Sequence, residues 1–129
     1  MTVLVLEDDH TIRAIIRAVL TNRSHRVLEA TDADEAVTVS DQHRGPLKVL
    51  IADVMLKAPN GVETAKRILA SRPELRVLFV SGYPVERFKD RLAKLPLHRI
   101  RFLQKPFAPA KLLSELDALL ANEGAAHSE

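Results

Sequence analysis

Five short apolar runs recur along the chain, and segments of mixed polarity separate them. The runs lie near residues 2–6, 26–30, 48–52, 76–80 and 100–103 and are rich in Val, Leu and Ile. Apolar and polar residues do not alternate strictly within them, which is typical of parallel strands that are buried on both faces. The pattern therefore predicts five buried strands.

The segments between these runs have the periodicity of helices. One predicted buried helix face consists of Ile12, Ile15, Ile16, Val19 and Leu20. The last helix carries a second such face, with Leu112, Leu113, Leu116, Leu119 and Leu120. These leucines are expected in the core, because two turns are too few for a coiled coil.

Three further helices are expected between the strands. Asp32 and Glu35 form a capping pair for one that reaches about His43, before Gly45 and Pro46 break the chain. The next covers roughly residues 61–71 and ends before a proline at position 73. The helix around residues 85–94 has the weakest pattern of the five.

Alternation of strand and helix implies a parallel sheet with right-handed crossovers. Five strands fit the doubly wound, flavodoxin-like order 2-1-3-4-5, with five helices on the two faces. At 129 residues the chain is expected to form one domain, over residues 1–122. Residues 123–129 are expected to form a frayed, flexible tail.

Polar and charged residues follow the predicted strands at their carboxyl ends, where ligands bind in open α/β sheets. Carboxylates stand after the first and third strands, a hydroxyl after the fourth and an ammonium after the fifth: Glu7, Asp8, Asp9, Asp53, Ser81 and Lys105. In the expected order the first and third strands are neighbours, so Glu7, Asp8 and Asp53 should converge. The sequence therefore predicts an acidic pocket with a lysine at its rim.

Three carboxylates close together repel one another, so one pKa must rise or a cation must bind. A site with only oxygen ligands selects a hard cation, and Mg²⁺ takes one or two carboxylates plus water and phosphate oxygens. Asp is an accepted covalent carrier of a phosphoryl group, and phosphoryl transfer needs mainly positioning and charge stabilisation. A carboxylate nucleophile, a divalent ion, Ser81 and Lys105 would supply those parts.

Composition narrows the other possibilities. There is no cysteine, which excludes disulfides and thiolate metal sites and suits a cytoplasmic protein. No apolar stretch is long enough to span a membrane, and the N-terminal one is too short for a signal peptide. The net charge of +2, from 19 basic and 17 acidic residues, is too even to suggest nucleic-acid binding. Basic residues do crowd positions 87–101, as a solvated helix face and loop or as a docking surface for an acidic partner.

The order of these motifs resembles the receiver domain of two-component response regulators. The resemblance covers about residues 2–121: an acidic pair after the first strand, one Asp after the third, Ser-Gly after the fourth and Lys-Pro-Phe after the fifth. It implies that Asp53 accepts a phosphoryl group from a phosphohistidine of a sensor histidine kinase or a histidine phosphotransfer protein. Ser81 and Lys105 would assist at the same centre.

The resemblance also assigns the metal ligands. The pair is best matched by Glu7 and Asp8, because Arg13 then follows the second acid by five residues. Asp8 would bind Mg²⁺ directly and Glu7 through water, with Asp53 and the backbone carbonyl of Met55 as further ligands. Asp9 is interpreted as the N-cap of the first helix in preference to a metal ligand.

Other implied features concern a conformational switch. Phe102 stands at the position of the family's switch aromatic, and Ser81 at that of its switch hydroxyl. The bond between Lys105 and Pro106 is expected to be cis. Two departures concern Lys57, where a proline is common, and Phe102, which lacks the hydroxyl of the commoner tyrosine.

We expect a phosphorelay signalling switch, not a turnover enzyme, with its output at the face of the fourth helix, fifth strand and fifth helix. A downstream protein target is implied, and a homodimer is left open. The main alternative is a degenerate receiver that binds a partner without phosphorylation. A phosphatase of the haloacid dehalogenase class would need an Asp at position 55, where Met55 stands, and Glu7, Asp8 and Asp9 would repel the phosphate of a flavin.

Overall fold

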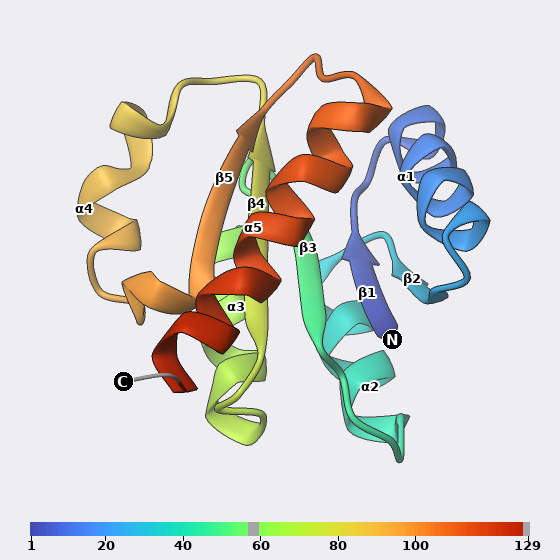
Figure 1. The fold of residues 1–129 in the computed structure, drawn as a ribbon, viewed down its shortest axis with the longest axis horizontal. Helices are drawn as coiled ribbons and strands as arrows, with labels where there is room; N and C mark the ends of the chain where they lie inside the picture. Colours follow the sequence, from blue (N-terminus) through green and yellow to red (C-terminus); the bar gives the residue numbers. More distant parts are fainter. Residues whose placement is uncertain (57–59, 128–129) are drawn as a thin grey trace.

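The computed structural model describes residues 1–56 and 60–127, with side chains up to residue 121. In this part of the chain, five parallel strands form one sheet in the order β2-β1-β3-β4-β5 (Figure 1). The strands are β1 (Thr2–Leu6), β2 (Arg26–Ala30), β3 (Val49–Asp53), β4 (Arg76–Ser81) and β5 (Ile100–Gln104). Both the doubly wound fold and its strand order are as predicted.

Helices cover both faces of the sheet. They are α1 (His10–Asn22), α2 (Ala33–Gln42), α3 (Gly61–Ser71), α4 (Lys89–Leu92) and α5 (Pro109–His127), with short 3₁₀ turns η1 (Val85–Phe88) and η2 (Leu97–Arg99) around α4. Figure 1 shows α1 and α5 in front of the sheet, with α2 and α3 behind it. The helical backbone of α5 continues beyond residue 122, where the sequence pattern placed the end of the domain, and the division there stays a prediction.

The caps predicted for the first two helices are present. The side chain of Asp9 accepts a hydrogen bond from the backbone of Ile12, which confirms Asp9 as the N-cap of α1. Asp32 accepts from the backbone of Glu35, and the Glu35 side chain accepts from the backbone of Thr31, so the two residues cap α2 reciprocally.

The prediction of one helix around residues 85–94 is wrong. The segment from Val85 begins as a 3₁₀ turn and becomes α-helical only over Lys89–Leu92. Phe88, between the two, has φ −119° and ψ 6°, which is not helical backbone. Its side chain is buried, and its ring packs beside that of Phe102 on β5.

The apolar face of α1 is narrower than its pattern predicted. Ile16 and Leu20 are buried, but Ile15 is 46% exposed. Adjacent residues differ by about 100° around a helix, so Ile15 cannot share the direction of Ile16.

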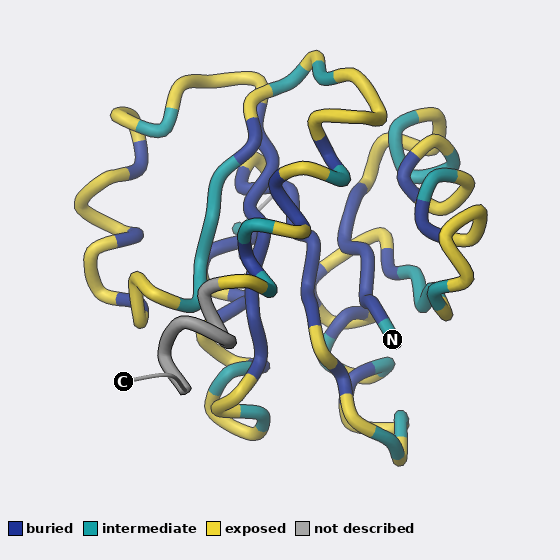
Figure 2. Tube along the Cα trace, viewed as in Figure 1, coloured by how far each residue is buried: buried dark blue, intermediate teal, exposed yellow. Residues whose placement is uncertain are grey.

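The sheet divides the apolar interior into two clusters. Successive strand residues point to opposite faces, so Leu4 and Leu6 pack with α2 and α3, whereas Val3 and Val5 pack with α1 and α5. Figure 2 shows the central strands β1, β3 and β4 almost entirely buried, with exposed residues along the outer sides of the helices; the edge strands β2 and β5 are mostly half-buried, so the predicted burial on both faces holds only for the central strands. None of the described helices has the length and apolar character needed to cross a membrane.

Candidate functional site

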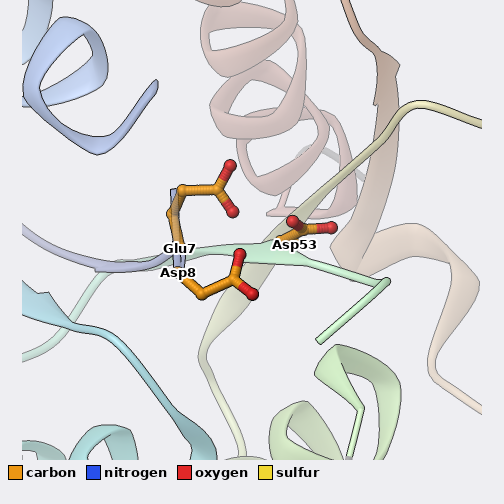
Figure 3. A group of neighbouring side chains, drawn as sticks. All are labelled: Glu7, Asp8 and Asp53. Atoms are coloured by element: carbon orange, nitrogen blue, oxygen red, sulfur yellow. The ribbon is translucent and has the colours of Figure 1, made fainter. Parts of the chain in front are cut away.

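Glu7, Asp8 and Asp53 converge at the carboxyl ends of β1 and β3, as predicted (Figure 3). Leu6 pairs with Ala52 in the parallel register, which brings the next residue of each strand to the same edge of the sheet. One carboxylate oxygen from each of the three acids lies within 4.8 Å of the others. Glu7 and Asp53 are buried, whereas Asp8 is exposed.

Lys105 reaches into this cluster from the end of β5. Its Nζ lies 2.5 Å from Oε1 of Glu7 and 3.0 Å from Oδ2 of Asp53, and its side chain is only 17% exposed. The Lys105–Pro106 bond is cis, as expected. The ammonium therefore lies within the acidic pocket and bridges two of its carboxylates.

Burial is the main influence on the ionisation of Glu7. It raises the pKa of Glu7 to about 8; the hydrogen bond with Asp53 acts in the same direction, and the contact with Lys105 opposes both. Burial lowers the pKa of Lys105, but its hydrogen bonds to Glu7 and Asp53 outweigh burial, so the pKa of Lys105 is raised overall. Lys105 is therefore a fixed positive charge beside Asp53.

Backbone contacts hold Asp53 in place. Its Oδ1 accepts a hydrogen bond of 2.9 Å from the backbone nitrogen of Met55. Gly61, the first residue of α3, packs directly behind it: a Cβ at Gly61 would lie 2.1 Å from the carbonyl oxygen of Asp53. Only glycine allows α3 to approach the end of β3 so closely.

The acidic cluster fits a hard divalent cation. Oε2 of Glu7 is buried and has no hydrogen-bond partner among the described residues. Together with Asp8 and Asp53 it offers oxygen ligands of the type that Mg²⁺ prefers. The carbonyl of Met55 as a further ligand stays a prediction, and Lys57 lies outside the described residues.

Ser81 ends β4 with its side chain fully buried, and its Oγ accepts a hydrogen bond of 3.0 Å from the backbone of Tyr83. The carbonyl oxygen of Ser81 accepts a 2.7 Å hydrogen bond from the backbone of Lys105. The ends of β4 and β5 are therefore joined next to the site.

Phe102 is partly buried on β5, with its ring centroid 6.1 Å from that of Phe88. It borders a surface groove of about 470 Å³ between β5 and the segment that contains η1 and α4. The other lining residues include Val85, Lys89, Leu92, Leu97, Ile100 and Arg101.

The basic cluster at this face is less available than its sequence suggested. Arg101 forms an ion pair of 2.7 Å with Glu115 of α5, and the guanidinium of Arg87 lies 4.2 Å from the ring centroid of Tyr83. The sequence does not predict this ion pair. Glu115 precedes the core residue Leu116 on α5, and a charged residue at such a position is expected to face solvent.

Two more contacts at the site could not be read from the sequence. The sequence places Lys105 at the rim of the acidic pocket, but it does not reveal the direct pairing with Glu7, which lies 98 positions away. Arg13 donates to the backbone carbonyl of Glu7; its spacing from the acidic pair is visible in the sequence, but this contact with the main chain is not.

Two solved structures of similar length share the fold of this chain. The chemotaxis protein CheY4 of Vibrio cholerae superposes with a TM-score of 0.82 at 24% identity, over 92% of this chain and 97% of that one. The receiver domain of the hybrid histidine kinase CckA superposes with a TM-score of 0.76 at 26% identity, over 92% and 99% of the two chains.

Two curated relatives are longer than this chain. The response regulator GtcR of Aneurinibacillus migulanus is 30% identical over 119 residues, which are 92% of this chain and 47% of GtcR. The sensor kinase CckA of Brucella abortus is 26% identical over 122 residues, which are 95% of this chain but 13% of CckA. This chain thus spans about half or less of the length of these two relatives.

The sequence model of the response regulator receiver domain matches residues 3–117, nearly the whole of the described sheet and its helices. With the acidic cluster, Ser81 and Lys105 at the strand ends, this match shows that the chain belongs to the response regulator receiver domain family.

Proposed function

We propose that this receiver domain is a phosphorelay switch that accepts a phosphoryl group on Asp53 from a phosphohistidine. The observation that carries the proposal is the position of the Asp53 carboxylate, which is buried between the Lys105 ammonium and two further acids. The similarity to the receiver domain of a sensor kinase, CckA, supports a histidine kinase or histidine phosphotransfer protein as the donor.

In the transfer, a carboxylate oxygen of Asp53 forms a bond to phosphorus while the bond between phosphorus and the imidazole nitrogen breaks. The imidazole leaves with the electron pair of that bond and takes up a proton. Mg²⁺ held by Glu7, Asp8 and Asp53 would neutralise charge on the phosphoryl oxygens. Lys105, already 3.0 Å from Asp53, is placed to pair with one of these oxygens.

Ser81 can contribute a further hydrogen bond. Its Oγ accepts from the backbone of Tyr83, so the hydroxyl hydrogen is left to donate. A phosphoryl oxygen on Asp53 would be a strong acceptor. The ends of β4 and β5 would then be drawn toward Asp53 together, because the backbone of Lys105 is bonded to Ser81.

This movement would reach the face formed by α4, β5 and α5 through Phe102. Phe102 has no hydroxyl, so packing against Phe88 and the groove sets its position in either state. We propose that a downstream protein reads this face, that the domain is cytoplasmic, and that it is a signalling switch and not a turnover enzyme.

Acetyl phosphate with Mg²⁺, followed by intact-mass measurement, tests the acceptor role. The wild-type protein should gain one phosphoryl mass, and Asp53→Asn should gain none. Equal labelling of the variant would refute the assignment of Asp53. A wild-type protein that folds and binds a partner but is never labelled would favour the degenerate, phosphorylation-independent receiver.

Beryllofluoride, which mimics the phosphoryl group, tests the switch. Backbone amide NMR shifts should change around Asp53 and also across residues 83–107. Changes confined to the pocket would contradict the switch and favour a simple carrier of phosphoryl groups.

A further inference from the structure

Arg13 of α1 joins three elements beside the acidic site. Its Nη1 donates a hydrogen bond of 2.8 Å to the carbonyl oxygen of Glu7, at the end of β1. Its Nε lies 3.3 Å from Oε1 of Glu29 on β2. The side chain is only 15% exposed, and its Nη2 also lies 3.4 Å from Nδ1 of His10, so the guanidinium is held by these partners and not free in solvent.

The carbonyl of Glu7 belongs to the peptide unit that links Glu7 to Asp8. That unit is planar, so a hydrogen bond that fixes its oxygen also fixes the orientation of the plane. The backbone nitrogen of Glu7 is held as well, by a hydrogen bond of 3.1 Å to the carbonyl oxygen of Ala30. Together the two bonds set the directions in which the side chains of Glu7 and Asp8 leave the main chain.

This restraint acts against electrostatic repulsion among the three acids. The carboxylates of Glu7, Asp8 and Asp53 approach within 4.8 Å and repel one another when ionised. Asp8 is exposed, and of the three it has the most freedom to turn away into solvent. A backbone fixed at the peptide before Asp8 limits that escape.

We propose that Arg13 is a positioning residue for the metal site: it holds the peptide between Glu7 and Asp8 in the orientation that presents both carboxylates to Mg²⁺. Glu29 holds the guanidinium in turn. The inference rests on the proposed function, because the divalent ion is what the acids are taken to hold. Groups that orient metal ligands commonly contribute 10- to 100-fold to metal affinity.

The chain offers a matched control in Arg17. Its Nη1 lies 3.3 Å from the other oxygen of Glu29, and its side chain is 52% exposed. It shares the anion with Arg13 and carries the same charge, but its hydrogen bond and ion pair are with Glu29 and not with Glu7. Arg17→Ala therefore removes a neighbouring cation without removing the hydrogen bond to the Glu7 carbonyl.

The test is a Mg²⁺ titration of the full chain, in which binding is monitored through the backbone amide NMR shifts of Asp8 and Asp53. Arg13→Ala should weaken Mg²⁺ binding by about tenfold or more, and Arg17→Ala should change it by less than about twofold. Loss of a positive charge near the acids would by itself strengthen binding of a cation, so charge and positioning predict opposite signs for Arg13→Ala.

Arg13→Lys keeps the charge but loses the planar fork that serves Glu7 and Glu29 together. It should weaken Mg²⁺ binding several-fold, and it carries the test if Arg13→Ala does not fold. Thermal unfolding without Mg²⁺ reports the structural contribution separately: a merely structural arginine would lower the unfolding temperature and leave the Mg²⁺ affinity of the folded variant unchanged.

The outcomes separate this inference from the proposed function. If the wild-type protein shows no Mg²⁺-dependent shifts and no labelling of Asp53, the proposed function fails. If the wild-type protein binds Mg²⁺ and is labelled, but the folded Arg13 variants bind within twofold of it, only the role of Arg13 is overturned.

Discussion

Gly61→Ala is expected to damage the site from behind. A Cβ at Gly61 would lie 2.1 Å from the carbonyl oxygen of Asp53 and 2.8 Å from its carbonyl carbon. Both atoms belong to the backbone, so no side-chain rotation can relieve the clash. Either the start of α3 or the end of β3 must move, and Asp53 is the last residue of that strand.

Two opposing contributions determine how far Gly61→Ala changes the free energy of unfolding. Forcing an extra methyl group into a filled site costs about 1–3 kcal/mol, and contact with backbone places Gly61 near the upper end of that range. Alanine returns at most about 1 kcal/mol through its higher helix propensity. We therefore expect the free energy of unfolding to fall by roughly 2 kcal/mol, a large share of the 5–15 kcal/mol typical of a domain.

Gly82→Ala is the matched control. Gly82 follows Ser81, a Cβ there would meet no described atom within 4 Å, and its φ is not positive. Alanine should leave stability unchanged or raise it by about 0.4–1 kcal/mol, because it restricts the unfolded chain. Urea unfolding of the two variants compares them directly.

Labelling by acetyl phosphate adds a functional readout. Under folding conditions Gly61→Ala should be labelled more slowly than the wild-type protein, because its Asp53 is displaced. If Gly61→Ala unfolds at the same urea concentration as the wild-type protein, or at a higher one, then the close approach of α3 to Asp53 is not a constraint on the fold.

Three further predictions concern single side chains. Asp8→Ala should weaken Mg²⁺ binding more than Asp9→Ala does. Asp9→Ala should instead lower the free energy of unfolding by about 1 kcal/mol, because α1 loses its N-cap. If Mg²⁺ titrations gave the reverse order, the metal-binding pair would be Asp8 and Asp9 instead of Glu7 and Asp8. The ion pair with Arg101 lowers the pKa of Glu115, so its stabilisation is present above the ordinary carboxyl pKa and lost as pH falls through the folded value. Glu115→Gln should therefore flatten the fall in urea-unfolding free energy below about pH 4.5, and an unchanged profile would dismiss this pair as a source of stability. Met55 is 48% exposed and cannot orient water strongly, so Met55→Asn should shorten the lifetime of the phosphorylated form measured by mass, and an equal or longer lifetime would count against this reasoning.

The strands and their order could be predicted because the signals are local and repeated. Each apolar run became a strand, with β3 shifted by one residue to end at Asp53, and with β4 and β5 extended by Ser81 and Gln104. The convergence of Glu7, Asp8 and Asp53 followed from that order, since residues at the ends of neighbouring parallel strands must meet.

The features that could not be predicted depend on tertiary contacts. In the weakly patterned segment around residues 85–94, Phe88 packs beside Phe102 of β5, and the backbone at Phe88 departs from helical geometry. In the same way, the sequence indicates that Arg101 is a surface cation, whereas the structure places Glu115 beside it. Periodicity describes which face of an element is apolar, and not which partner it meets.

The separation of the apolar interior by the sheet has an evolutionary consequence. Phe79 and Phe88 belong to the layer beneath α2, α3 and α4, whereas Leu103 and Leu116 belong to the layer beneath α1 and α5. Substitutions that share no packing partners are close to additive. Descendants of this chain could therefore exchange the side chains of one layer to suit a new partner without retuning the other, while the acids at the strand ends, which belong to neither layer, keep the same chemistry.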